Sequence, residues 1–263
     1  MTETQLTLVQ IDNYGPWTVT PEPRPEMDLQ VLQSRLYADV AAFVGSRGGY
    51  AFPTRYDNLV AVTNGLDRNE HRRLQESLGN RYPVTASLGV GSDASPATAL
   101  DEATAQVQAA GSAQDGDRRE VLGFASDPPT PGPEDVAIAH FDVDDVTGEY
   151  TDRLNAYDSL LVVDRAAVSL MGHLREAHGG LVFFVGGDNF VAAVPDISTT
   201  AYRQAIDHVA EETGVSLKVG VGTGPTAADA GMTAKHALER CRHDGTAVEF
   251  GHDHERPESA ADD

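Results

Sequence analysis

A β-hairpin sequence occurs twice in this chain, and the repetition constrains the fold more than any other feature. GGLVFFVGGDNFVAAV at residues 179–194 matches GGYAFPTRYDNLVAV at residues 48–62, and the paired Asp-Asn turns lie 131 residues apart. The strand sequence VGVG at 219–222 follows LGVG at 88–91 by the same interval. The first strands, QID at 10–12 and HFD at 140–142, match with a shift of one residue. A repeat this long indicates a duplicated domain rather than a solenoid.

The turn of the second hairpin holds a carboxylate. Two apolar runs, LVFFV and FVAAV, flank Gly186-Gly187-Asp188-Asn189, which is a strong hairpin signal and predicts Asp188 at the hairpin tip. Gly, Asp and Asn are also ordinary turn formers, so the turn alone does not establish a function. That the Asp-Asn pair occurs in both copies favours a functional role for this turn.

Each copy reads as strand, acidic loop, helix, hairpin, helix, strand and helix. This is the ferredoxin-like order, so we expect an α+β fold with two tandem domains, each an antiparallel sheet with helices on one face. The predicted domains are residues 1–124 and 135–250, the second carrying GGDN. A proline-rich linker at 125–134 joins them, and a polar acidic tail at 251–263 is expected to be disordered.

Hydrophobic periodicity places the individual elements. Prolines at 21, 23 and 25 delay the first helix until about Met27. The expected helices cover residues 29–44, 68–78, 96–110, 157–177, 201–213 and 226–243. The expected strands cover residues 5–11, 82–91, 136–141 and 215–222, in addition to the two hairpins.

Composition limits the class of protein. The chain has 263 residues, a single cysteine and a formal net charge of −22, with 41 acidic against 19 basic residues. Such a surface repels nucleic acid but suits a protein kept soluble in concentrated salt, where self-repulsion is screened. No long apolar run or signal-peptide pattern occurs, and one cysteine cannot form an internal disulfide. We expect a cytoplasmic, halophilic protein that binds neither nucleic acid nor membrane.

A metal site is predicted in the second copy. The first strand ends at Asp142, and the ferredoxin-like topology sets this strand beside the Asp188 hairpin at the sheet centre. Two carboxylates so close repel each other unless a cation lies between them, and oxygen ligands suit Mg²⁺. Asp144 adds a third carboxylate, and Thr147-Gly148 offer a hydroxyl and backbone N–H groups to phosphate.

The first copy offers a related but different set. Asp12 and Asp57 stand at the matching positions, while Arg55 occupies the place of Gly186. Asp12 and Asp142 could instead be strand-end residues that cap nearby N–H groups. Lys218, one of only two lysines in a chain that otherwise uses Arg for positive charge, is a good point charge for phosphate.

Longer blocks carry a resemblance to a known family. FDVDD followed by GGDN is distantly similar to nucleotidyl cyclase, GGDEF and polymerase-palm domains, although Asn189 replaces the acid of GGDEF. The blocks QIDNYGPWTVTP, LQSRLYADVAAF, TRYDNLVAVTNG, NRYP, GSAQD, AYDS and FFVGGDNF together resemble the archaeal GTP cyclohydrolase III family, from about residue 5 to residue 250. No Cys/His cluster with zinc spacing is present, unlike in the zinc cyclohydrolases.

The resemblance implies an activity. The family opens the imidazole ring of GTP and retains the formyl group, giving 2-amino-5-formylamino-6-(5-phosphoribosylamino)pyrimidin-4(3H)-one. It also hydrolyses the triphosphate, uses Mg²⁺, responds to K⁺ and feeds riboflavin and deazaflavin biosynthesis. We therefore expect GTP as the substrate and a homo-oligomer as the assembly.

Specific roles follow on this interpretation. The expected Mg²⁺ ligands are Asp142, Asp144 and Asp188. The candidates for catalysis are Asp12, Asn13, Asp57 and Asp188. The candidates for substrate binding are Tyr14, Gly15, Trp17, Arg55, Asn58, Thr147, Gly148, Gly187, Asn189 and Lys218. Tyr14 and Trp17 could stack on the base or simply pack the first loop. A nucleotidyl cyclase and a non-catalytic GTP sensor remain the alternatives.

Overall fold

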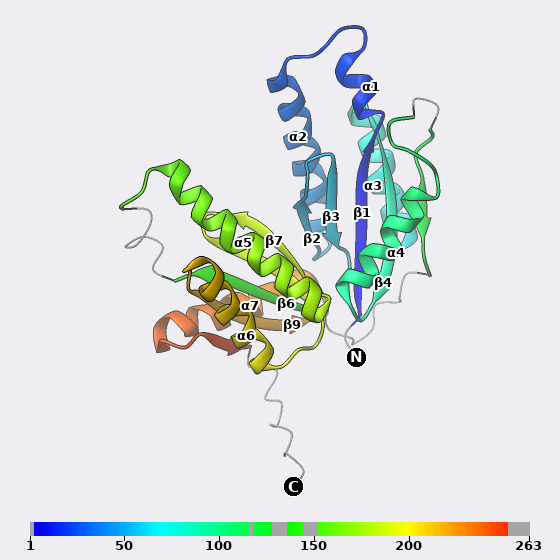
Figure 1. Cartoon of the computed structure of the whole chain (residues 1–263). Helices are drawn as coiled ribbons and strands as arrows, with labels where there is room; N and C mark the ends of the chain where they lie inside the picture. Colours follow the sequence, from blue (N-terminus) through cyan, green and yellow to red (C-terminus); the bar gives the residue numbers. More distant parts are fainter. Residues whose placement is uncertain (1–2, 116–117, 128–135, 145–151, 252–263) are drawn as a thin grey trace.

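The computed structural model describes residues 3–115, 118–127, 136–144 and 152–251. These residues form two five-stranded sheets, one from each half of the sequence, and every sheet carries helices (Figure 1). The α+β class with two tandem ferredoxin-like units is thereby confirmed. Most of the predicted linker and nearly all of the predicted tail lie outside the described residues.

The first half places β1 at the centre of its sheet, in the strand order β2-β3-β1-β4-β5. Its elements are β1 (Thr4–Asp12), α1 (Tyr14–Val19), α2 (Glu26–Gly45), β2 (Tyr50–Pro53), β3 (Asn58–Val62), α3 (Arg68–Arg81), β4 (Thr85–Asp93), α4 (Pro96–Gln108) and β5 (Leu122–Phe124). The short helix α1 occupies the segment that we expected to be a loop.

The second half repeats this arrangement around β6, in the order β10-β9-β6-β8-β7. Its elements are β6 (Val136–Val143), α5 (Ala156–His178), β7 (Leu181–Gly186), β8 (Asn189–Val194), α6 (Thr199–Thr213), β9 (Leu217–Gly224), α7 (Ala227–Asp244) and β10 (Val248–Phe250). Read from the hairpin edge, the two sheets have the same strand order, so the duplication inferred from sequence extends to topology.

Two details differ from the expected antiparallel sheet with helices on one face. The short edge strands β5 and β10 pair in parallel with β4 and β9, which makes both sheets mixed. One helix of each half, α4 in the first and α7 in the second, lies on the opposite face of its sheet from α2 and α3 or from α5 and α6. Glycines permit this close approach, because a Cβ on Gly89 would collide with the carbonyl of Ala103 in α4. A Cβ on Gly220 would meet the Ala234 carbonyl in α7 in the same way.

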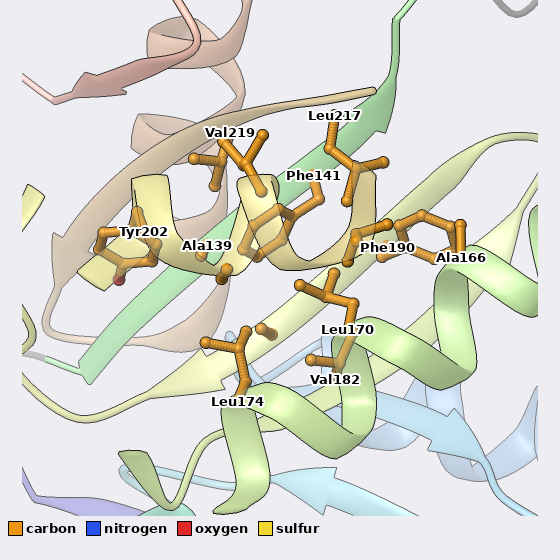
Figure 2. Packing of buried hydrophobic residues seen from close by; sticks show 14 of the residues in the cluster. Ala139, Phe141, Ala166, Leu170, Leu174, Val182, Phe190, Tyr202, Leu217 and Val219 are labelled. Atoms are coloured by element: carbon orange, nitrogen blue, oxygen red, sulfur yellow. The ribbon is translucent and has the colours of Figure 1, made fainter. Parts of the chain in front are cut away.

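Each sheet has its own hydrophobic core, on the face covered by α2 and α3 in the first half and by α5 and α6 in the second. In the second half, Phe141 of β6 packs with Leu170 of α5 and Tyr202 of α6, and all three side chains are fully buried. Figure 2 shows these side chains pointing into the space between the sheet and its helices. The corresponding core of the first half joins β1 to α2 and α3. Neither core includes the Asp-Asn turns.

A third core joins the two halves and has approximate two-fold symmetry. Phe52 and Phe183, which are equivalent residues of the repeat, stack on each other with ring centroids 4.3 Å apart and planes inclined by 4°. The N–H of Ala228 donates to Gly48 O (2.8 Å), and its counterpart Ala97 donates to Gly179 O (2.9 Å). The halves therefore pack face to face as two similar subunits do in a dimer.

None of the helices in the described ranges combines the length and apolar character needed to cross a bilayer.

Candidate active site

The second hairpin carries Asp188 to the end of the central strand. Antiparallel pairing of β6 with β8 sets Asp142 opposite Asn189, and the N–H of Val143 donates to Asp188 O at 3.2 Å. Gly186 and Gly187 adopt φ values of 108° and 65°, which glycine tolerates without strain. Backbone pairing thus brings Asp142 and Asp188 together, as the sequence predicts.

Asp142 is the more confined of these two acids. It is 6% exposed, and this burial raises the pKa of its carboxyl group. Arg242, in the last turn of α7, opposes that shift with Nη2 2.8 Å from Asp142 Oδ1, whereas the negative charge of Asp188 adds to it. The Arg242 side chain forms an ion pair with Asp142, but its angle does not suit a hydrogen bond. Asp142 Oδ1 therefore accepts no hydrogen bond from the described groups. A buried carboxylate that lies beside a second acid and has one arginine as its counter-charge fits a divalent cation such as Mg²⁺.

A hydrogen-bond relay fixes the other acid of the pair. Asn189 Nδ2 donates to Asp188 Oδ1 at 2.8 Å, and Asn189 Oδ1 lies 3.0 Å from His140 Nε2. Because the amide oxygen accepts, His140 donates through Nε2. Burial lowers the pKa of His140, which favours the neutral ring. His140 is therefore a structural support for the hairpin turn.

Asp144 and Lys218 pair with each other rather than with the two acids. Lys218 Nζ donates to Asp144 Oδ1 at 2.7 Å, in a partly buried ion pair. No set of three His, Cys, Asp or Glu side chains gathers into a ligand group within the described ranges. The structure thus brings together two of the three predicted Mg²⁺ ligands. The predicted phosphate contacts Thr147 and Gly148 lie outside the described residues.

The first half has an equivalent relay at its own hairpin. Gln10 Nε2 donates to Asn58 Oδ1 at 3.2 Å, and Asn58 Nδ2 donates to Asp57 Oδ1 at 2.9 Å. The N–H of Ile11 donates to Asp57 O at 2.9 Å, as that of Val143 does to Asp188. Arg55 Nη2 completes the turn at 3.0 Å from Asp57 Oδ2 and is largely exposed.

Strand register corrects one sequence pairing. We matched Asp12 with Asp142 from the sequence. In the sheets, however, Gln10 faces Asn58 of β3 and Ser87 of β4. Asp142 likewise faces the equivalent residues, Asn189 of β8 and Lys218 of β9. The counterpart of Asp142 is therefore the neutral Gln10, and the counterpart of Asp12 is Asp144. The side chains agree, because Ser87 Oγ donates to Asp12 as Lys218 donates to Asp144. A shift of two residues keeps every side chain on the same face, so hydrophobic alternation could not reveal it.

Asp12 lies in a closed polar cluster on the β4 side of the central strand. It is fully buried, and burial raises the pKa of its carboxyl group. Ser87 Oγ donates to Asp12 Oδ2 at 2.5 Å, and Arg118 Nη1 lies 3.5 Å from Asp12 Oδ1. Arg118 also donates to Gln10 Oε1 at 3.0 Å and to Val107 O at 3.2 Å. Asp57 lies on the other side of β1, so the structure separates these two candidate acids.

The segment after Asp12 packs against the GSAQD motif. Asn13 takes a φ of 56°, its N–H donates to Ala113 O at 3.2 Å, and its Oδ1 is buried without a partner in the described part of the chain. The Gln114 side chain occupies the space that a Cβ on Gly15 would need. Two of the sequence blocks behind the family resemblance therefore meet in space.

One of the two aromatic residues of α1, Trp17, faces a cavity on the first half. Tyr14 and Trp17 stack with ring centroids 6.2 Å apart, and Tyr14 Oη accepts a hydrogen bond from Gln33. The guanidinium of Arg24 lies 4.4 Å from the Trp17 ring. Trp17 and Arg24 line an open cavity of about 630 Å³ together with residues of α2 and the end of α3. A larger cavity of about 1150 Å³ lies between α5 and α6 and contains no predicted site residue.

Sequence reasoning missed Arg118 and Arg242. Both are cations that reach a carboxylate of β1 or β6 from a segment far along the chain. No local sequence motif predicts either contact. Only the positive charge of these two arginines, in so acidic a chain, could have indicated a role for them.

Comparison with known proteins extends the resemblance. The sequence model of the family described as GTP cyclohydrolase III matches residues 5–252. A GTP cyclohydrolase III from Halorubrum lacusprofundi is 60% identical over 95% of this chain and 97% of its own length. The protein of that name from Natronomonas pharaonis is 59% identical, with 95% and 99% covered. That from Methanocaldococcus jannaschii is 46% identical, with 90% and 88% covered.

Solved structures give a weaker likeness. A GGDEF domain from Pseudomonas aeruginosa covers 44% of this chain and 82% of its own, with a TM-score of 0.38 and 21% identity. A bacterial light-regulated adenylyl cyclase covers 44% and 74%, with a TM-score of 0.37 and 18% identity. The family assignment rests instead on the sequence matches, which span nearly the whole chain. This chain belongs to the GTP cyclohydrolase III family.

Proposed function

We propose that this protein is a GTP cyclohydrolase that hydrolytically opens the imidazole ring of GTP, retains the formyl group and also hydrolyses the triphosphate. The observation that carries the proposal is the match to GTP cyclohydrolase III over residues 5–252, with relatives 46–60% identical. The paired acids Asp142 and Asp188 supply a site suited to the triphosphate end of that substrate.

The second half is proposed to hold Mg²⁺ and the triphosphate. Asp142 and Asp188 would be the protein ligands, and the bare turn of Gly186 and Gly187 lets phosphate approach the backbone closely. When bound, Mg²⁺ would neutralise phosphate charge and lower the pKa of a coordinated water. Arg242 adds a cation beside Asp142 that can turn toward phosphate oxygens, because its side chain is 42% exposed.

Ring opening needs a water molecule placed at C8 of guanine. The water oxygen bonds to C8 and the C8–N9 bond breaks, so the formyl group stays on N7, and N7 and N9 each gain one of the two protons of the water. A positioned base must take a proton from the water. Asp57 is the proposed base, since it is partly exposed and its orientation is fixed by Asn58. Asp12 is enclosed by Ser87 and Arg118, so we propose for it the support of the neighbouring loop.

Ultraviolet absorbance of the product tests the reaction class. With GTP, Mg²⁺ and high KCl, the purine absorbance is expected to disappear as the ring opens, with release of phosphate. A nucleotidyl cyclase would instead leave the purine chromophore intact, and a GTP sensor would release unchanged GTP. Retention of the purine spectrum in every product would contradict the proposal. Activation by K⁺ and a homo-oligomeric assembly stay predictions of the family resemblance, and a cytoplasmic location stays a prediction from the composition.

The two hairpins are expected to differ in function. Arg55→Ala should raise the KM for GTP about tenfold, the order expected for one hydrogen bond to a charged group. Asp57→Asn should impair turnover less than Asp188→Asn does, because the proposed metal pair lies in the second half. Steady-state kinetics measure both, with Arg175→Ala as a control that removes an exposed arginine paired to Asp101 on the surface. A larger loss at Asp57 than at Asp188, together with a changed Mg²⁺ dependence for Asp57→Asn alone, would place the principal metal site in the first half.

A further inference from the structure

Tyr56, at the tip of the first hairpin, has a left-handed backbone conformation. Its φ is 63°, and Asn13 is the only other non-glycine residue with a positive φ in the described ranges. Asparagine tolerates this region, whereas a bulky aromatic residue there is a genuine outlier. Unfavourable backbone geometry of this kind concentrates at ligand-binding sites, where function retains it.

The second half shows what the turn itself requires. Gly187, the counterpart of Tyr56 in the repeat, has a φ of 65°, and the following Asp-Asn pair makes the same hydrogen bonds in both turns. The turn therefore needs a left-handed residue at this position and forms readily with glycine. The fold does not account for a tyrosine there.

Packing does not account for the ring either. Tyr56 is 49% exposed and is one of the large side chains left at the surface. Tyr37 of α2 lies nearby: burial raises the pKa of Tyr37, and the phenol of Tyr56 raises it further. Two tyrosines therefore lie together beside the first hairpin, and the ring of Tyr56 is the more exposed of the two.

We infer that Tyr56 binds the purine of GTP by stacking its ring on the base. The inference rests on the proposed function and adds a residue to it. Tyr56 directly precedes Asp57, the proposed base, and follows Arg55, whose exposed guanidinium pairs with that acid. A purine held against this ring lies next to the groups proposed to act on it. Base–aromatic stacking strengthens binding by about five- to 150-fold per base.

Three variants separate the ring from the turn. Tyr56→Phe keeps a ring, Tyr56→Leu keeps an apolar side chain without one, and Tyr56→Gly copies the turn of the second half. Calorimetric titration in Mg²⁺ and high KCl would use two ligands: 7-deaza-GTP, whose carbon at position 7 prevents ring opening, and inorganic triphosphate. Thermal unfolding of the free protein gives the stability of each variant.

The inference predicts opposite changes in binding and stability for Tyr56→Gly. Its affinity for 7-deaza-GTP should fall at least fivefold, while its Tm rises by about 2–4 °C because the backbone strain is relieved. Tyr56→Leu should lose the same affinity, Tyr56→Phe should keep it within twofold, and inorganic triphosphate should bind all four proteins equally. Gly214→Ala, at an exposed left-handed helix end, is the matched control and should lower Tm.

Undiminished binding of 7-deaza-GTP by Tyr56→Leu and Tyr56→Gly would overturn the inference. So would an equal loss for inorganic triphosphate, which would indicate a deformed turn, or a fall in Tm for Tyr56→Gly. A wild-type protein that binds 7-deaza-GTP through Tyr56 but leaves the purine spectrum of GTP intact would refute the proposed ring opening while supporting the stacking.

Discussion

Replacing Asp142 by asparagine is expected to reduce the turnover of GTP by about 100-fold or more, the equivalent of the several kcal/mol that a metal ion contributes to catalysis. The substitution removes the charge of a buried oxygen that has only the ion pair with Arg242. It empties no core volume, so the fold should persist. Asp188→Asn should have an effect of the same order, because the two acids act as one pair.

Turnover measured across a range of Mg²⁺ concentrations gives the result, and circular dichroism confirms that each variant is folded. Asp101→Asn is the matched control, because this exposed acid of α4 pairs only with Arg175 among the contacts described. It should leave turnover unchanged. Near-normal turnover with unaltered Mg²⁺ dependence in both active-site variants would refute the metal site.

Replacing Arg118 by methionine should lower the free energy of unfolding by about 3–5 kcal/mol, the usual cost of removing one partner of a buried ion pair. The Arg118 side chain is 2% exposed and donates to Gln10, Ser87 and Val107. Its loss leaves the carboxylate of Asp12 in the interior without a counter-charge. Urea unfolding in high KCl, where surface charges are screened, measures the change.

A double variant distinguishes a charge effect from a packing effect. Asp12→Asn combined with Arg118→Met removes both charges and should recover part of the lost stability, because neutral replacements of a buried pair are well tolerated. A destabilisation below about 1 kcal/mol for Arg118→Met would show that water compensates for the arginine.

Much of the fold was predictable because its signals are local and occur twice. The turn at Asp188 and the turn at Asp57 each predicted a hairpin, and their common spacing predicted the second sheet from the first. Strands β5 and β10 were missed because three residues carry too little pattern to distinguish a strand from a loop. The six residues of α1 were read as a loop for the same reason.

The candidate site was predictable only where the backbone itself brings residues together. Asp142 and Asp188 meet through strand pairing, which topology determines. The partner of Lys218 depends instead on side-chain length and direction, so no sequence pattern pointed to its ion pair with Asp144. Arg118 reaches Gln10 across 108 residues of sequence, and no periodicity reports a contact of that kind.

The stacked pair of Phe52 and Phe183 has a consequence for how the two halves can diverge. The two rings occupy equivalent positions of the repeat and also pack against each other. A smaller residue at one position therefore leaves a gap that only a larger residue at the other can fill. Substitutions at this contact must therefore occur in compensating pairs. Gln10 and Asp142 lie within separate sheets and carry no such coupling. The residues at the contact between the halves have thus stayed alike in the two copies. The residues at the ends of the central strands were free to become chemically different.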